Sequence, residues 1–219
     1  MACTESGRGS MTAVDKRISV AVLGSGAGSN AAALIDRSSA NDSSYQIDLV
    51  IATRGDAGIV SVASDRRIPV VVLPAEHWEE SLLSALQSHQ IAVLALAGFL
   101  RKLPESVITL LEGNVLNIHP ALLPRFGGQG MYGLHVHTAV IEAGESITGA
   151  TVHRVTQEYD EGAILAQMSV EVRAGDDPRT LQNRVKTIEH RLYPEIMNVY
   201  CQHIRDSTSS PPNNPKPQL

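Results

Sequence analysis

Ile18-Ser-Val-Ala-Val-Leu-Gly-Ser-Gly-Ala-Gly-Ser-Asn30 passes from an apolar run into a glycine-rich turn. The β-branched residues of 18–23 predict a buried strand. Alternating glycines at Gly24, Gly26 and Gly28 predict a tight turn, and the residues that follow predict a helix at 30–37. Strand, turn and helix in this order are the first part of a βαβ unit.

The same alternation continues along the chain. Strands are predicted at 47–52, 70–73, 91–97 and 114–118, and helices at 57–66, 77–89 and 104–111. A glycine-rich loop at 121–133 is followed by a predicted helix at 135–143, strands at 148–155 and 164–170, and a last helix at 178–204. Helices that alternate with strands at this spacing predict an α/β fold with a doubly wound, mostly parallel, Rossmann-like sheet.

Length and composition limit the class of protein. The 219 residues, of which 43% are hydrophobic, predict a single domain at 18–204 between a disordered leader at 1–17 and a disordered tail at 205–219. A net charge of −5 without a basic stripe argues against nucleic acid as a partner. No apolar run reaches the length of a membrane span. Two distant cysteines, Cys3 and Cys201, fit a reducing, cytoplasmic location.

A polar pair ends the predicted strand at 114–118. Asn117 and His119 are two residues apart, so in an extended chain they point to the same face. Pro120 then ends the strand, because it has no N–H to donate. The carboxyl end of a strand is where open α/β sheets bind ligands. With Asp160 from a later loop, these side chains could stabilise negative charge on an acyl oxygen and move one proton.

The glycine turn indicates an anion site. Backbone N–H groups at the start of a helix attract phosphate. A P-loop is excluded because the turn has no lysine, and a dinucleotide fingerprint is weakened because Ser29 stands at its third glycine. Arg54, at the end of the second strand, keeps an NADP site open as an alternative. A single phosphate at Gly28, Ser29 and Asn30 is the simpler interpretation.

Five motifs carry a resemblance to a known family. They are Gly24-Ser-Gly-Ala-Gly-Ser-Asn30, Leu96-Ala-Gly-Phe99, Asn117-Ile-His-Pro-Ala-Leu-Leu-Pro124, Val155-Thr-Gln-Glu-Tyr-Asp-Glu-Gly162 and Glu189-His190. Over residues 18–204 the chain resembles the phosphoribosylglycinamide formyltransferases of purine biosynthesis. The resemblance implies transfer of a formyl group from 10-formyltetrahydrofolate to the amine of glycinamide ribonucleotide, without a metal, by a monomer or homodimer.

The resemblance also implies roles for individual residues. Asn117, His119 and Asp160 would be catalytic, in a domain whose N-terminal half binds phosphate and whose C-terminal half binds folate. The phosphate and ribose would be held by Gly28, Ser29, Asn30, Ala31, Ala32, Lys186 and Glu189. The folate would contact Arg101, Lys102, Leu103, Asn117, Val155, Thr156, Gln157, Glu158, Tyr159 and Asp160. Asp160 is expected to raise the pKa of His119, so that an imidazolium donates to the oxyanion.

Several features leave alternatives open. The loop at 126–133 is about five residues longer than the family pattern, and 74–80 lacks the arginine that often meets the folate tail. His135 and His137 suggest a metal only weakly, because positions i and i+2 diverge on a helix. The alternatives are another folate-dependent formyltransferase, a formyl-folate hydrolase, or a non-catalytic phosphate- or NADP-binding module.

Overall fold

A computed structural model describes residues 17–209 of the chain. Residues 1–16 of the predicted leader and residues 210–219 of the predicted tail lie outside the described residues. The strands are β1 (Ile18–Gly24), β2 (Tyr45–Ala52), β3 (Val70–Val72), β4 (Val93–Leu96), β5 (Val115–His119), β6 (Ile147–Arg154) and β7 (Ile164–Glu171). The helices are α1 (Ser29–Ser38), α2 (Gly58–Asp65), α3 (Trp78–Ser88), α4 (Glu105–Leu110), α5 (Leu134–Glu142) and α6 (Pro178–Ser209).

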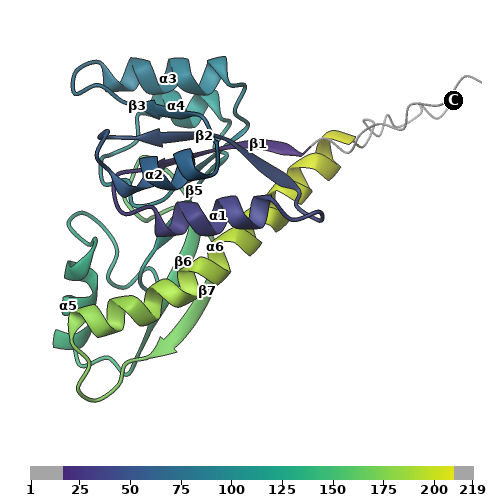
Figure 1. The fold of residues 1–219 in the computed structure, drawn as a ribbon. Coiled ribbons are helices and arrows are strands. Elements are labelled where there is room, and N and C mark those ends of the chain that lie inside the picture. Colours follow the sequence, from purple (N-terminus) through teal and green to yellow (C-terminus); the bar gives the residue numbers. More distant parts are fainter. Residues whose placement is uncertain (1–16, 210–219) are drawn as a thin grey trace, which may run out of the picture.

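The strands form one seven-stranded sheet in the order β3-β2-β1-β4-β5-β6-β7 (Figure 1). From β1 the chain winds outward through β2 and β3, then returns to β4 and winds the other way. The strands β1 to β5 are parallel to one another, whereas β6 is antiparallel to both β5 and β7. This topology confirms the predicted doubly wound, mostly parallel α/β fold. It places a switch point between the carboxyl ends of β1 and β4, where such sheets bind ligands.

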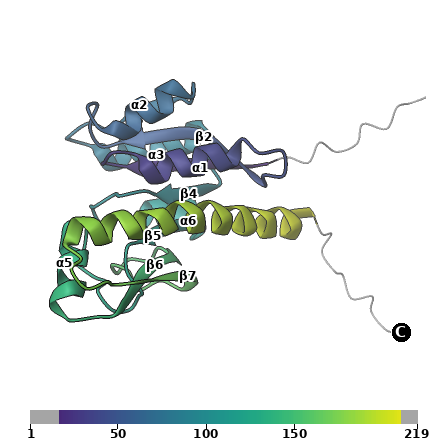
Figure 2. The ribbon, with the colours of Figure 1, turned by 60° about the horizontal axis from the view of Figure 1, so that its bottom comes forward.

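Helices cover both faces of the sheet because successive strand residues point to opposite sides. Val20 and Val22 of β1 belong to a core that α1, α2, α5 and α6 complete. Ala21 and Leu23 belong to a second core, completed by α3 and α4. Figure 2 shows α6 lying alongside α1 and reaching α5 at its N-terminal end. Within residues 17–209, no helix is both long and apolar enough to cross a bilayer.

The last helix is longer than the sequence predicts. It continues to Ser209, so the predicted end at 204 and the start of the tail at 205 are both wrong. Cys201 is fully buried and Ile204 packs against the core, which holds this end of the helix in place. Ser207 and Thr208 donate their hydroxyls to the carbonyls of His203 and Ile204. Polar side chains of this kind lower helix propensity but can bond back to the helix, so composition alone misplaces the end.

Gly28 fixes the turn between β1 and α1. Its φ of +81° lies in the left-handed region, and a Cβ there would lie 2.7 Å from Cα of Ile59. We expect Gly28→Ala to destabilise the fold by about 1–3 kcal/mol, because it adds both backbone strain and overpacking. Thermal unfolding should show a fall in Tm of roughly 2–4 °C per kcal/mol. The matched control is Gly26→Ala, because a Cβ at Gly26 meets nothing within 4 Å. Equal Tm values for the two variants would contradict this account.

Candidate active site

One cavity of about 520 Å³ opens at the carboxyl ends of β4 and β5. Its walls come from segments that are far apart in the sequence. They include Asn30, residues 98–103, 117–120, 128–133 and 155–160, His137, His153, and Gln182, Val185, Lys186 and Glu189 of α6. Ser25, in the turn after β1, donates its hydroxyl to the carbonyl of Gly98 at 2.7 Å, which joins the two loops at the switch point.

The three predicted catalytic side chains meet in this cavity. Asn117 and His119 are on β5, and Asp160 lies in the loop between β6 and β7. Oδ2 of Asp160 is 3.4 Å from Nδ1 of His119. The other ring nitrogen, Nε2, is 2.7 Å from the carbonyl oxygen of Phe126. A carbonyl can only accept, so Nε2 of His119 carries a proton and Nδ1 faces the carboxylate.

His153 is a fourth member of the site that the sequence reasoning missed. It lies opposite Asn117 in the antiparallel register of β5 and β6. Its Nδ1 is 2.9 Å from the carbonyl of Arg154, and its Nε2 is 3.1 Å from Nδ2 of Asn117. Nδ1 donates to that carbonyl, and the contact of Nε2 with the Asn117 amide helps to fix the orientation of the amide. The sequence offers no signal for this contact, because the spacing of residues along the chain does not show which residues of β5 and β6 lie opposite each other.

The loop after β5 is fixed where it leaves the sheet and where it reaches Asp160. Thr151 of β6 donates its hydroxyl to the carbonyl of Ala121 and accepts the N–H of Leu123. Further along, the N–H of Gly128 donates to Oδ2 of Asp160 at 2.9 Å. A Cβ on Gly127 would lie 2.5 Å from Cδ2 of Leu123 and 3.3 Å from Cβ of Asp160. The glycine pair therefore allows the loop to approach the carboxylate closely.

Asp160 is itself held in a strained conformation. Its φ is +58°, in the left-handed region that residues with a Cβ adopt rarely. Only 12% of its side chain is exposed, and Oδ1 lies 3.4 Å from Nε2 of His153. The carboxylate thus lies between two imidazoles. Strain of this kind persists where surrounding contacts determine the position, as the contacts to His119, His153 and Gly128 do here.

The charge state of His119 differs from the expectation. Burial lowers its pKa, and this effect outweighs the upward effects of Asp160 and of the hydrogen bond to Phe126. The expected rise in pKa is therefore wrong, because the sequence indicated the carboxylate but not a side chain that is only 4% exposed. His119 is accordingly neutral at pH 7, with its proton on Nε2. It remains a hydrogen-bond donor, but an uncharged one.

Asp160 is the charged member of the set. Burial raises its pKa, but the imidazoles of His153 and His119 and the N–H of Gly128 together lower it below its usual value. Asp160 is therefore a carboxylate at neutral pH. A proton that arrives on Nδ1 of His119 would lie against this negative charge, which stabilises the imidazolium.

The predicted phosphate residues surround the start of α1. Gly28 precedes the helix, and Ser29, Asn30 and Ala31 form its first turn, whose N–H groups have no partner within a helix. The N–H of Ala32 already donates to the carbonyl of Gly28 at 2.8 Å. Of these residues only Asn30 lines the cavity with its side chain, whereas the side chain of Ala31 lies in the core.

Lys186 and Glu189 face the same end of the cavity from α6. Nζ of Lys186 donates to Oε1 of Gln182 at 3.3 Å. Oε2 of Glu189 accepts from Nδ2 of Asn30 at 3.0 Å, which links α6 to α1. Glu189 is only 6% exposed. Burial raises its pKa, against the opposing effects of Asn30 and Lys186. These surroundings differ from the surface ion pair that helical spacing would otherwise predict.

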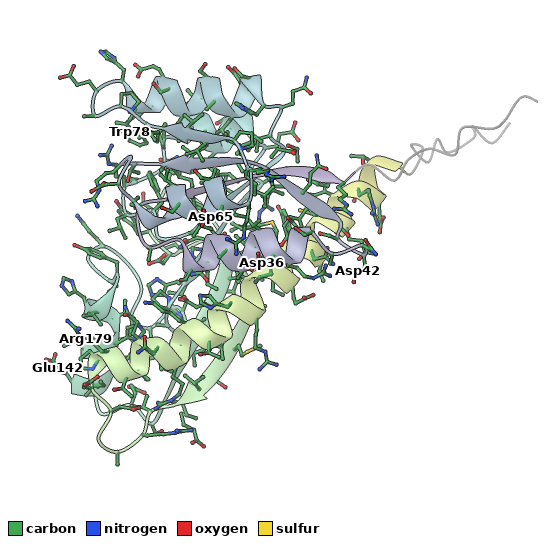
Figure 3. All side chains as sticks on the ribbon, viewed as in Figure 1. Asp36, Asp42, Asp65, Trp78, Glu142 and Arg179 are labelled. Atoms are coloured by element: carbon green, nitrogen blue, oxygen red, sulfur yellow. The ribbon has the colours of Figure 1, made fainter. Side chains whose placement is uncertain are left out.

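The residues predicted to surround the folate line the opposite part of the cavity. Arg101, Lys102 and Leu103 follow β4 and face the segment from Val155 to Asp160. Nζ of Lys102 is 3.6 Å from Oε1 of Glu158, so an ion pair links the two walls. The guanidinium of Arg101 lies 5.2 Å from the ring centre of Trp78, whose position at the start of α3 is labelled in Figure 3.

His137, on α5, lines the cavity, although the sequence suggested only a weak metal role for it. It is 1% exposed, and its pKa is lowered to about 4, first by burial and then by the charges of Lys186 and His119. Other predicted features lie elsewhere. Arg54 is exposed and pairs with Asp56. Within residues 17–209, no group of three or more His, Cys, Asp or Glu side chains is arranged to hold a metal ion.

The lowered pKa of His137 predicts a loss of stability in acid. The unfolded ring has a pKa near 6.5, so the unfolded state binds more protons and stability falls as the pH drops from 6.5 toward about 4. The full effect is on the order of 3 kcal/mol, at 1.36 kcal/mol for each pH unit. Urea unfolding at several pH values should show a flatter acid limb for His137→Gln than for the unsubstituted chain. The exposed His135→Gln is the control, and identical limbs for the unsubstituted chain and His137→Gln would rule out this contribution.

Comparisons with known proteins point to one family. A family model described as formyl transferase matches residues 18–197. The phosphoribosylglycinamide formyltransferase of Escherichia coli (strain K12) is 34% identical over 190 residues, which cover 84% of this chain and 87% of that protein. The solved structure of phosphoribosylglycinamide formyltransferase from Brucella melitensis has a TM-score of 0.78 at 38% identity, covering 85% of this chain and 96% of that one.

A plant relative is of similar identity but greater length. The chloroplastic phosphoribosylglycinamide formyltransferase of Arabidopsis thaliana is 38% identical over 194 residues, 85% of this chain and 66% of that protein. The chain therefore spans slightly less than two thirds of that relative. Because the family model covers most of residues 17–209 and the bacterial relatives match over nearly their whole length, the chain belongs to the formyl transferase family, among its phosphoribosylglycinamide formyltransferases.

Proposed function

We propose that the chain transfers a formyl group from 10-formyltetrahydrofolate to the amine of glycinamide ribonucleotide, a step of purine biosynthesis. The observation that carries the proposal is the meeting of Asn117, His119 and Asp160 at the centre of a cavity with two chemically different ends. One end offers a helix N-terminus, Lys186 and Glu189, which suit a ribose phosphate. The other offers apolar walls and loop backbone, which suit a flat heterocycle.

The chemical step needs a donor for the oxyanion. The amine nitrogen of the ribonucleotide attacks the formyl carbon, and the carbonyl electrons move to oxygen as a tetrahedral species forms. Asn117 uses one N–H on His153, and the second N–H is available for the oxyanion. The second donor is the Nε2–H of His119, which must exchange the carbonyl of Phe126 for the oxyanion as the tetrahedral species forms. Each such donor contributes about 3–4 kcal/mol to transition-state stabilisation.

The proton balance assigns a part to Asp160. The attacking amine loses one proton, and the departing folate nitrogen gains one as the carbon–nitrogen bond breaks. While the proton is in transit, Nδ1 of His119 can hold it against Oδ2 of Asp160, 3.4 Å away. The imidazolium is then transient, as the lowered pKa of His119 requires. These steps pass through protein side chains alone.

Binding of the substrates follows the two ends of the cavity. The phosphate would lie on the N–H groups of Ser29, Asn30 and Ala31 at the start of α1, and the ribose hydroxyls would bond to Glu189. The pterin ring would lie between the segments 101–103 and 155–160. In this assignment 10-formyltetrahydrofolate is a co-substrate that leaves as tetrahydrofolate.

The deciding experiment is an absorbance assay that follows conversion of 10-formyltetrahydrofolate to tetrahydrofolate with and without glycinamide ribonucleotide. We expect conversion only with the acceptor present. Conversion without the acceptor would indicate a formyl-folate hydrolase. No conversion in either mixture would indicate a non-catalytic binding module. Methionyl-tRNA as acceptor tests the other folate-dependent formyltransferases.

The setting of the enzyme is part of the proposal. We infer a cytoplasmic location from the two cysteines, and a monomer or homodimer as the working form. The plant relatives are described as chloroplastic, so cell fractionation is the appropriate test of compartment. Sedimentation over a range of protein concentrations would determine the oligomeric state.

A further inference from the structure

His135 and His137 share the short helix α5 but have opposite environments. His135 is exposed and its ring lies 5.3 Å from that of Tyr132. His137 is 1% exposed, where α5 packs on α6. Figure 3 labels Glu142 on α5 and Arg179 on α6, which lie near the ends of these two facing helices. A buried polar side chain at such a contact requires a partner.

The ring of His137 has no hydrogen-bond partner among residues 17–209. Nδ1 is fully enclosed and unpaired. Nε2 is not enclosed in this way, and the ring lines the cavity, so Nε2 is the nitrogen that faces the open space. A ligand in the cavity can therefore bond to Nε2, whereas the enclosed Nδ1 is out of its reach.

The charges around His137 identify the kind of ligand. Lys186 is the permanent charge that acts on this imidazole, and His119 adds to it only when protonated. Lys186, on α6, lines the same cavity. Glu189, the nearby acid, is already bonded to Asn30. A neutral N–H donor beside an ammonium group favours an anion with several acceptor oxygens, since both can bond to it at once.

We propose that His137 is a positioning residue for the ribonucleotide and donates a hydrogen bond from Nε2 to the phosphate group that Lys186 faces. The inference rests on the proposed function for the identity of the phosphate-bearing substrate. It assigns His137 a part in holding that substrate and none in moving the formyl group. The enclosed Nδ1 then carries the lone pair.

The test uses three substitutions and one control. Glutamine places an amide N–H near the position of Nε2, asparagine places it near Nδ1, and leucine removes the donor. We expect His137→Leu and His137→Asn to raise KM for glycinamide ribonucleotide about 10- to 100-fold, the loss for one hydrogen bond to a charged group. Turnover at saturation should stay within about threefold, and His137→Gln should restore most of the affinity. His135→Gln should match the unsubstituted chain.

A second measurement separates this inference from the proposed function. Calorimetric titration with inorganic phosphate needs no formyl transfer. We expect the dissociation constant to rise in His137→Leu by the same factor as KM, and to recover in His137→Gln. Equal phosphate affinity in all variants that fold would overturn the role of His137, even if the transfer assay succeeds. If the transfer assay fails but the phosphate titration follows this pattern, only the proposed function is refuted. Should His137→Leu fail to fold, the glutamine and asparagine variants decide the outcome.

Discussion

Replacing Asp160 with asparagine is expected to lower kcat by a factor of about 10² to 10⁴, the range for removing a group that assists proton transfer. Asparagine has nearly the same shape and can still accept the N–H of Gly128, which donates to Asp160 at 2.9 Å. It carries no charge, however, and cannot stabilise a proton on Nδ1 of His119. The loss should therefore fall on the chemical step.

The pH dependence of kcat gives a second test of the role of Asp160. Burial already lowers the pKa of His119, and Asp160 is the main opposing effect. Without the carboxylate, the pKa of His119 falls further, so an imidazolium is still harder to form at any pH. The measurement is kcat against pH with both substrates saturating. An unchanged rate and profile in Asp160→Asn would remove the carboxylate from the mechanism.

A stability control must accompany the rate. The folded-state pKa of Asp160 is lowered, so its carboxylate contributes stability above the unfolded pKa near 3.8. That contribution is lost as the pH falls through the folded pKa, and Asp160→Asn should lack it at every pH. Thermal unfolding at neutral pH shows whether the variant remains folded under the assay conditions. A folded variant with a large loss of kcat attributes the effect to chemistry.

The sequence predicted the fold well because hydrophobic period and turn chemistry are local properties. The run at 18–23 and its glycine turn correspond to β1 and the start of α1. The strand predicted at 91–97 is shorter, Val93–Leu96, because strand ends depend on which neighbours pair. The last helix extends past its predicted end for a tertiary reason, the packing of Cys201 and Ile204 on the core.

The candidate site was predictable where residues lie close together in the chain. Asn117 and His119 are two apart on one strand, so their common direction follows from strand geometry. The contact between Asn117 and His153 follows instead from the antiparallel register of β5 and β6, which no local pattern encodes. The same holds for His137, since its burial depends on how α5 packs on α6.

The charge state predicted for His119 was wrong for a related reason. The nearby carboxylate of Asp160 suggested a raised pKa for His119, because a negative charge stabilises the imidazolium. Burial acts in the other direction, and its size depends on the loop that closes over the ring at Phe126. Sequence shows which charges are available, whereas the balance between them and burial is a property of the folded chain.

The Asn117 side chain gives the second large prediction. Asn117→Ala should lower kcat by about 10² to 10³, the usual loss for one oxyanion donor. KM for either substrate should change little, since the N–H acts on an oxygen that becomes negative only in the transition state. Steady-state kinetics with each substrate varied in turn would show this division. An equal rise in KM with kcat unchanged would mean that Asn117 binds the ground state.

His153 provides the matched control for this prediction. It orients the Asn117 amide through Nε2, 3.1 Å away, but the proposed mechanism gives it no contact with the formyl oxygen. His153→Gln leaves the donor in place and removes only part of its orientation, so its loss in kcat should be clearly smaller. Since the two side chains act through one donor, the double variant should resemble Asn117→Ala alone. A double variant whose losses multiply would instead mean that His153 acts on the reaction independently, through its 3.4 Å contact with Asp160.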